Sequence, residues 1–144
     1  MLDRKSYRQD EIDNGRNAIE SMLTARIALL DAINSEDPEG TARSTLADLD
    51  PLFFNTLTLA LDRYYVYRGR ADSGEGASAL DELALIVESL MNNAGIFRVG
   101  DAAGYVPARA IARLEEGDPI RLTAHQFERL SNAVFAELEA GFLE

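Results

Sequence analysis

Several residue types are absent from this chain or nearly so. It contains no cysteine, which excludes disulfides, thiolate metal sites and cysteine nucleophiles. It contains one histidine, His125, whose predicted helical position faces solvent. Because a metal site needs three or four ligands, a lone exposed histidine does not make one. The sequence therefore predicts neither a metal nor a cofactor.

Long apolar runs are also missing. No stretch approaches the roughly 20 apolar residues of a membrane span. The first residues, MLDRKSYRQDEID, lack the apolar segment of a signal peptide. We therefore expect a cytoplasmic protein with no membrane association.

Positive charge is scarce. The chain has 14 Lys and Arg against 25 Asp and Glu, and its net charge is −11. Such an acidic surface repels phosphate backbones, so we expect no nucleic-acid binding. The 144 residues, 47% of them hydrophobic, are typical of a single globular domain. We predict one helical domain over 1–144, with residues 1–8 disordered.

Hydrophobic periodicity predicts four principal helices. Apolar residues recur at spacings of three, four and seven in stretches that are separated by Gly, Pro and polar turns. Asp50-Pro51 is typical of a helix start, with Asp as the N-cap and Pro at the first helical position. Thr123 and Gln126 match a capping box. The predicted helices cover residues 9–34, 51–68, 78–93 and 123–142.

The segments between these helices predict minor elements. Pro107 can open a short helix that ends before Gly117. Ile96–Val99 and Ile120–Leu122 alternate at period two, so they could pair as a two-stranded ribbon that leans on the helices. The predicted fold class is an all-α, bundle-like domain of four principal helices plus short helices, with this ribbon as a minor addition.

Motifs for catalysis are weak. The chain has no Gly-x-Ser-x-Gly sequence, and an exposed His125 is a poor base for a serine nucleophile. Gly74-x-Gly76-x-x-Ala79 matches a relaxed dinucleotide fingerprint, but a helix and a polar loop precede it instead of a strand. We predict no catalytic residues, which makes an enzyme the less favoured class.

The stretch ALDRYYVYRGR, residues 60–70, combines tyrosines, arginines and one aspartate near the end of the second helix. Charges inside an apolar helix need partners, because an unpaired buried charge is very costly. The polar groups of this helix could line a ligand groove, or they could form a network that orients helices or an interface. The candidate ligand or interface residues are Asn55, Thr58, Asp62, Arg63, Tyr64, Tyr65, Tyr67 and Arg68.

The second helix also carries a narrow apolar stripe opposite its core face. Leu52, Leu59 and Val66 are spaced by seven residues and flanked by polar positions, which is typical of a seam with a second helical layer. We therefore predict a non-catalytic interaction protein that acts as a homodimer. Two alternatives stay open: a small-molecule pocket lined by Asn55, Asp62, Tyr65 and Arg68, and an acidic module that docks on a basic protein.

Overall fold

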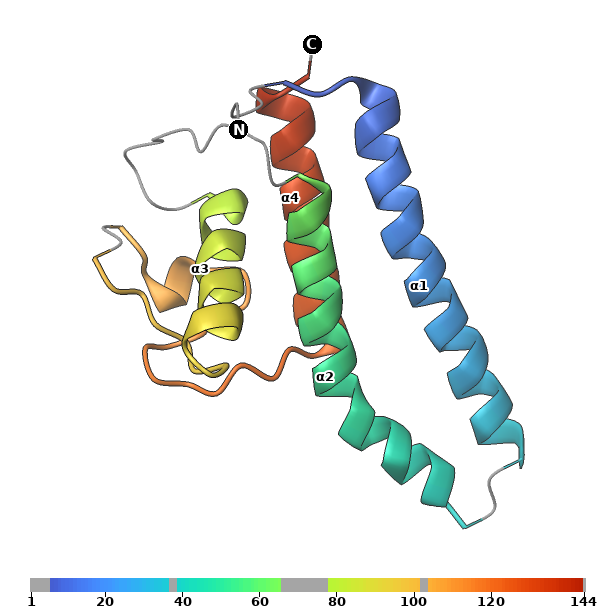
Figure 1. Ribbon diagram of the computed structural model, residues 1–144. Helices are drawn as coiled ribbons and strands as arrows, with labels where there is room; N and C mark the ends of the chain where they lie inside the picture. The colour runs from blue at the N-terminus through green and yellow to red at the C-terminus, as the bar shows by residue number, and fades with distance from the viewer. Residues whose placement is uncertain (1–5, 37–38, 66–77, 102–103, 144) are drawn as a thin grey trace.

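A computed structural model of the chain describes residues 6–36, 39–65, 78–101 and 104–143. The described residues form four α-helices and one short 3₁₀ helix and contain no strand, so the predicted all-α, bundle-like fold is confirmed (Figure 1). The elements are α1 (Gln9–Glu36), α2 (Thr41–Tyr64), α3 (Ala79–Asn92), η1 (Pro107–Arg109) and α4 (Ala124–Gly141).

The helices α1 and α2 are the longest and form an antiparallel hairpin (Figure 1). The predicted helix start at Asp50-Pro51 is wrong, because α2 begins ten residues earlier at Thr41 and continues through Pro51. Asp50 instead accepts hydrogen bonds from the guanidinium of Arg26, at 3.0 Å from Nε. Asp50 therefore lies inside α2 and connects it to α1 through this ion pair. A proline within a helix removes one backbone hydrogen bond, and α2 bends partway along its length (Figure 1).

The helices α3 and α4 both begin at residues whose side chains cap the helix N-terminus. Thr123 accepts from the backbone N–H of Gln126, and the Gln126 side chain accepts from the N–H of Thr123, which confirms the predicted capping box of α4. Ser78 caps α3 through a 3.0 Å bond from the N–H of Asp81. The carboxylate of Glu137 on α4 accepts from the N–H of Leu80, so α4 satisfies a second free donor at the start of α3.

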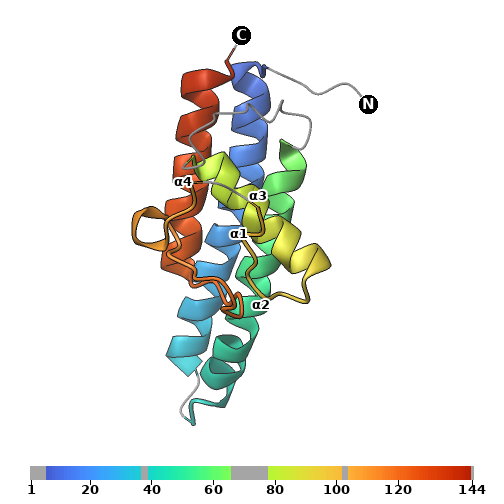
Figure 2. The ribbon, with the colours of Figure 1, turned by 90° about the vertical axis from the view of Figure 1, so that its left-hand side faces the viewer.

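The four helices are arranged so that α2 and α4 lie between α1 and α3. The helix α4 packs against α1, α2 and α3, whereas α3 packs against α2 and α4 but not α1. Figure 2 shows α3 lying obliquely across the neighbouring helices. The core between these elements is built mainly from Leu, Ile and Phe, including Ile12, Phe54, Leu83, Phe127 and Leu138, all fully buried.

The predicted ribbon is not supported. Ile96 forms an isolated antiparallel bridge with Pro119, next to single backbone bonds such as Phe97 N–H to the carbonyl of Asp118 at 2.8 Å. Pro119 has no N–H to donate, so the pairing cannot continue as a ladder at that position. The following residues are instead held to α2 by Asn55, whose amide donates to the Ile120 carbonyl and accepts from the N–H of Leu122.

The two ends of the described chain meet. Tyr7 donates its N–H to the carbonyl of Phe142 and forms a parallel bridge with Leu143. The Tyr7 side chain is 3% exposed and packs edge-on against Tyr65. Of residues 1–8, which the sequence predicts to be disordered, Tyr7 is therefore part of the core, whereas residues 1–5 lie outside the described chain. None of the described helices is apolar enough over a sufficient length to cross a lipid bilayer.

Candidate interaction surface

The predicted tyrosine cluster separates into buried and exposed side chains. Tyr65 is 1% exposed, and its hydroxyl donates a 3.0 Å hydrogen bond to the carbonyl of Ile12 on α1. Burial raises the pKa of Tyr65 to about 12, although the nearby charge of Arg16 acts in the opposite direction. Tyr64, one residue earlier, is 51% exposed. Tyr65 therefore fastens α2 to α1 as a neutral hydrogen-bond donor.

The polar candidates deeper in α2 are also engaged in holding the fold. Thr58 is fully buried and donates its hydroxyl to the carbonyl of Phe54 in the preceding turn. Both functions of the Asn55 amide bind the backbone at residues 120–122, as described above. The hydrogen-bonding groups of Asn55 and Thr58 thus have partners within the protein, which favours the structural interpretation of these two residues over the ligand groove.

Two further candidates, Asp62 and Arg63, belong to the last turn of α2. Asp62 is half-buried, and its backbone carbonyl accepts from the N–H of Tyr65. Arg63 is exposed. Val66, Tyr67 and Arg68 lie outside the described residues. The structure therefore brings Asp62 and Arg63 together at the end of α2.

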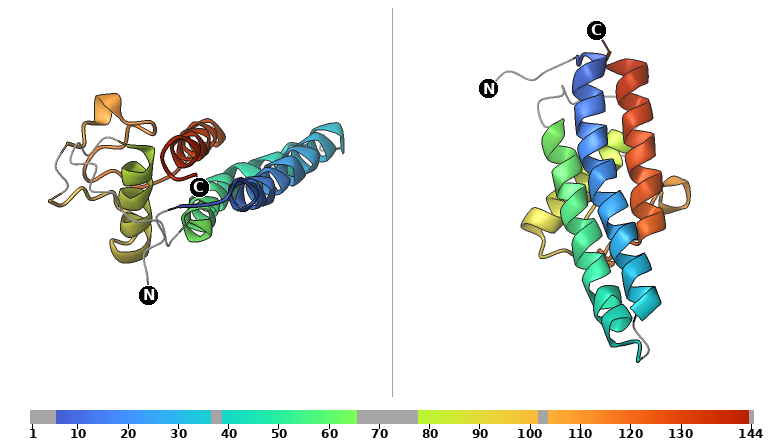
Figure 3. Two further views of the ribbon diagram at one scale, coloured as in Figure 1. Left: turned by 90° about the horizontal axis from the view of Figure 1, so that it is seen from above. Right: turned by 90° about the vertical axis from the view of Figure 1, so that its right-hand side faces the viewer.

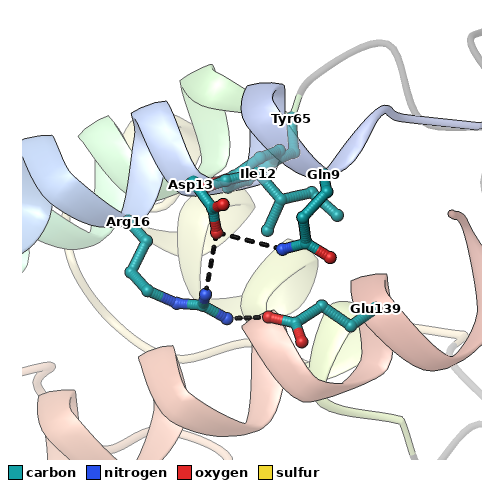
Figure 4. A network of polar contacts seen from close by, with 6 residues as sticks. All are labelled: Gln9, Ile12, Asp13, Arg16, Tyr65 and Glu139. Atoms are coloured by element: carbon teal, nitrogen blue, oxygen red, sulfur yellow. Dashed lines mark hydrogen bonds and ion pairs between the residues drawn. The ribbon is translucent and has the colours of Figure 1, made fainter.

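A polar network that the sequence analysis did not single out joins α1 to α4 (Figure 4). Arg16 donates to Asp13 at 3.1 Å and pairs with Glu139, and its guanidinium stacks 5.0 Å from the centre of the Phe135 ring. Gln9 also donates to Asp13, at 3.0 Å. Partly exposed ion pairs of this kind contribute little stability each, so we assign the network to the orientation of α4 on α1.

A surface depression of about 290 Å³, including space open to solvent, lies beside the start of α3. Glu82 in its lining is 6% exposed and accepts the N–H groups of Ile111 and Ala112 at 2.7 and 2.8 Å. Tyr105 donates its hydroxyl to the carbonyl of Leu114, and burial together with the charge of Glu82 raises its pKa to about 12. The lining residues are Ser78, Glu82, Gly104, Tyr105, Val106, Arg109 and Ala110.

These groups are poorly suited to catalysis. A phenol with a pKa near 12 stays protonated at neutral pH and is a weak general base there. Glu82 has both carboxylate oxygens committed to the backbone of the loop that follows η1. Within the described ranges, no three carboxylate or imidazole groups come together in a way that could hold a metal ion. We interpret the depression as a by-product of the way Glu82 anchors this loop.

A distinctive surface lies on the α1–α2 hairpin, on the side that faces away from α4. Arg16 marks the α4 side of α1, and Ala25 is nine residues further along, which is half a turn around the helix. Phe54 marks the α4 side of α2, because its ring packs 5.8 Å from that of Phe127, and Leu52 is about 160° away from it. Figure 3 shows α4 on one side of α1 and α2, with none of the described helices on the other.

We call this side of the hairpin the outer face. Between positions 14 and 32 of α1 and between 42 and 60 of α2, the charged residues all point to other sides of the helices. The outer face itself is therefore uncharged over these ranges, although 27% of the chain is charged. None of its side chains is buried. The outer face comprises Asn14, Ala18, Ser21, Met22, Ala25, Ala28, Leu29 and Ala32 of α1 with Ala42, Thr45, Leu49, Leu52, Phe53, Thr56 and Ala60 of α2.

Large apolar side chains on this face are open to solvent. Met22, Leu29 and Leu49 are 48%, 51% and 49% exposed, and Leu52 is 64% exposed. The uncharged surface ends at the last turn of α2, where Arg63 is exposed and Tyr64, 51% exposed, lies near Gly15 of α1. An uncharged, partly apolar patch of this extent is typical of interaction sites, whose centres are depleted in charge.

The predicted stripe overlaps this surface only in part. Leu52 belongs to the outer face and is its most exposed large side chain. Leu59 is half-buried, and Val66 lies outside the described residues. The larger contribution of α1 to this surface was not predicted from the sequence, because Met22 follows the buried Ile12 and Ile19 at a helical spacing although it is 48% exposed.

Comparison of the chain with protein-family models, with curated proteins and with solved structures gives no match.

Proposed function

We propose that this protein is a non-catalytic interaction protein that acts as a homodimer, and that the outer face of α1 and α2 is its contact surface. The observation that carries the proposal is the coincidence of exposed Met22, Leu29, Leu49 and Leu52 with a charge-free surface on an otherwise acidic chain. Two copies with a net charge of −11 each repel one another. A contact surface without charge keeps the like charges apart and avoids their desolvation.

The size of the apolar surface limits the strength of such a dimer. Complete burial of a Leu or Met side chain contributes about 1.5–3 kcal/mol, so each half-exposed side chain can still gain about 1 kcal/mol. Four such side chains in each of two copies, together with the alanines and Phe53, give roughly 10 kcal/mol. Association costs about 4–15 kcal/mol. The net gain is therefore at most about 6 kcal/mol, and we propose a weak, reversible dimer whose dissociation constant lies between roughly tens of micromolar and 1 mM.

The two alternatives have weaker support. A small-molecule pocket around Asp62 would need Asn55 and Tyr65, whose hydrogen-bonding groups already hold the fold. A basic protein partner would be attracted by the net charge of −11, but the outer face contributes no acidic group to such a contact. A cytoplasmic location remains part of the proposal, because a protein without cysteine suits a reducing compartment.

Light scattering and sedimentation on the purified chain test the proposal. The measurement should run from a few micromolar to about 1 mM protein, so that it spans the proposed range of dissociation constants. We expect the mean mass to rise from that of the 15.8 kDa chain towards twice that value. A mass that stays monomeric up to about 1 mM refutes self-association.

Substitution of Leu29 by Glu tests the surface. Two carboxylates brought into the contact cost several kcal/mol, so L29E should raise the dissociation constant at least about a hundredfold. Thr24→Glu is the matched control: Thr24 is exposed on the same helix but lies about 140° away from Leu29, outside the outer face. If both variants dimerise like the original chain, the contact surface lies elsewhere.

A further inference from the structure

The outer face of α1 has a regular alternation of small and large residues. Ala18, Met22, Ala25, Leu29 and Ala32 follow one another at spacings of four, three, four and three. This is the spacing of a coiled-coil seam, which keeps all of these side chains towards one partner helix. Within the seam, each large side chain has an alanine before and after it.

We propose that two copies of the chain pack α1 against α1 in antiparallel orientation, about a two-fold axis near residue 27. This inference rests on the proposed homodimer and specifies how its two halves meet. In an antiparallel pair centred there, positions whose numbers add up to 54 face each other. Met22 then faces Ala32 of the partner subunit, and Leu29 faces Ala25 of the partner subunit.

This arrangement fills space evenly along the contact. Every large side chain of the seam lies opposite a small one, so the two helices can interdigitate at native density. The contact is isologous, since Ala32 in turn faces Met22 of the partner subunit. When the order of small and large seam residues from Met22 to Ala32 is read backwards, each small residue lies opposite a large one. The α1 surface therefore matches an antiparallel copy of itself, which favours a second copy of the chain as the occupant.

A parallel pair with the same seam is less favourable in two respects. It would place Met22 and Leu29 each against its own copy, with voids between them where alanine meets alanine. It would also bring Glu36 beside Glu36 of the partner subunit at the end of the hairpin, where like charges repel. In the antiparallel pair, Glu36 lies opposite the uncharged Ala18.

Disulfide cross-linking distinguishes the two orientations, and the chain has no cysteine of its own to interfere. Met22→Cys and Ala32→Cys are made separately, with tags of different size, and are oxidised alone and as a mixture. A disulfide needs Cα atoms within about 7 Å. In the antiparallel pair, position 22 lies about 15 Å along the axis from its own copy, at a rise of 1.5 Å per residue, but directly opposite position 32.

We expect covalent dimers only from the mixture, and only between the two differently tagged chains. Circular dichroism of both variants should match that of the unmodified chain, because both positions are exposed. Covalent dimers from either variant alone would overturn the antiparallel arrangement while leaving the homodimer in place. No cross-link at all from chains that light scattering shows to be dimeric would also overturn it. Monomers at about 1 mM would instead refute the proposed function itself.

Discussion

Gly15 lies where α1 and the end of α2 approach each other closely, so a larger residue at this position should disturb their packing. A Cβ atom at Gly15 would collide with the hydroxyl of Tyr65 and lie 2.8 Å from its Cζ. Tyr65 has little room to retreat. Its hydroxyl binds the carbonyl of Ile12, and its ring packs against those of Tyr7 and Phe135 at 5.6 and 6.2 Å. Gly15→Ala therefore forces either the helices or this aromatic cluster apart.

The size of the effect follows from opposing contributions. Alanine favours an α-helix over glycine by about 0.5–1 kcal/mol. Overpacking of a filled core costs about 1–3 kcal/mol. If the hydroxyl of Tyr65 also loses its partner while it stays buried, another 1–3 kcal/mol is lost. We expect Gly15→Ala to lower the free energy of unfolding by about 2–4 kcal/mol.

Urea denaturation followed by circular dichroism measures this change. Gly141→Ala is the matched control, because Gly141 is also helical and an added Cβ there meets no atom within 4 Å. It should stabilise the protein by up to about 1 kcal/mol. In a Tyr65→Phe background, which removes the nearest clashing atom, the cost of Gly15→Ala should shrink.

The reasoning would be refuted by two results. If Gly15→Ala stabilises the chain as Gly141→Ala does, then α1 and α2 do not approach each other as closely as the structure shows. If its cost is the same with Phe at position 65 as with Tyr, the collision with the hydroxyl is not its cause.

Two further predictions concern ionisable groups. Asp50→Asn should lower the free energy of unfolding by about 1–3 kcal/mol, because Arg26, whose side chain is 16% exposed, loses its charged partner. Asp48→Asn, at an exposed position of the same helix, should change it by less than about 0.5 kcal/mol, and equal effects would contradict the role of the ion pair. Burial raises the pKa of Tyr65 and Tyr105 from 10.0 to about 12, so the unfolded chain loses these protons first as the pH rises. Stability should be complete below pH 10 and fall between pH 10 and 12, and an unchanged urea midpoint between pH 9 and pH 11 would contradict this.

The sequence by itself determined the elements whose signals are local. The capping box at Thr123 and Gln126 depends on residues within one helical turn, so it could be predicted and is confirmed. The apolar spacing of α1 and α4 likewise predicts helices over nearly the residues that the structure shows. Such signals survive because no distant contact competes with them.

Other elements depended on partners far away in the chain. Asp50-Pro51 has the sequence of a helix start, but the pairing of Asp50 with Arg26, 24 residues earlier, accompanies a helix that continues through it. The alternation at Ile120–Leu122 has the pattern of a strand, but Asn55 binds this segment to α2. In both cases a tertiary contact outweighs a weak local preference.

The candidate surface shows the same division. The alanines of the hairpin and the spacing of its charged residues are already present in the sequence. Whether an apolar position on α1 or α2 is covered depends on which side α4 packs, and the periodicity of one helix contains no information on that. Thus Ile19 is buried and Met22, three residues later, is half exposed. Only the tertiary structure decided this, because α4 covers one side of the hairpin and leaves the other side exposed to solvent.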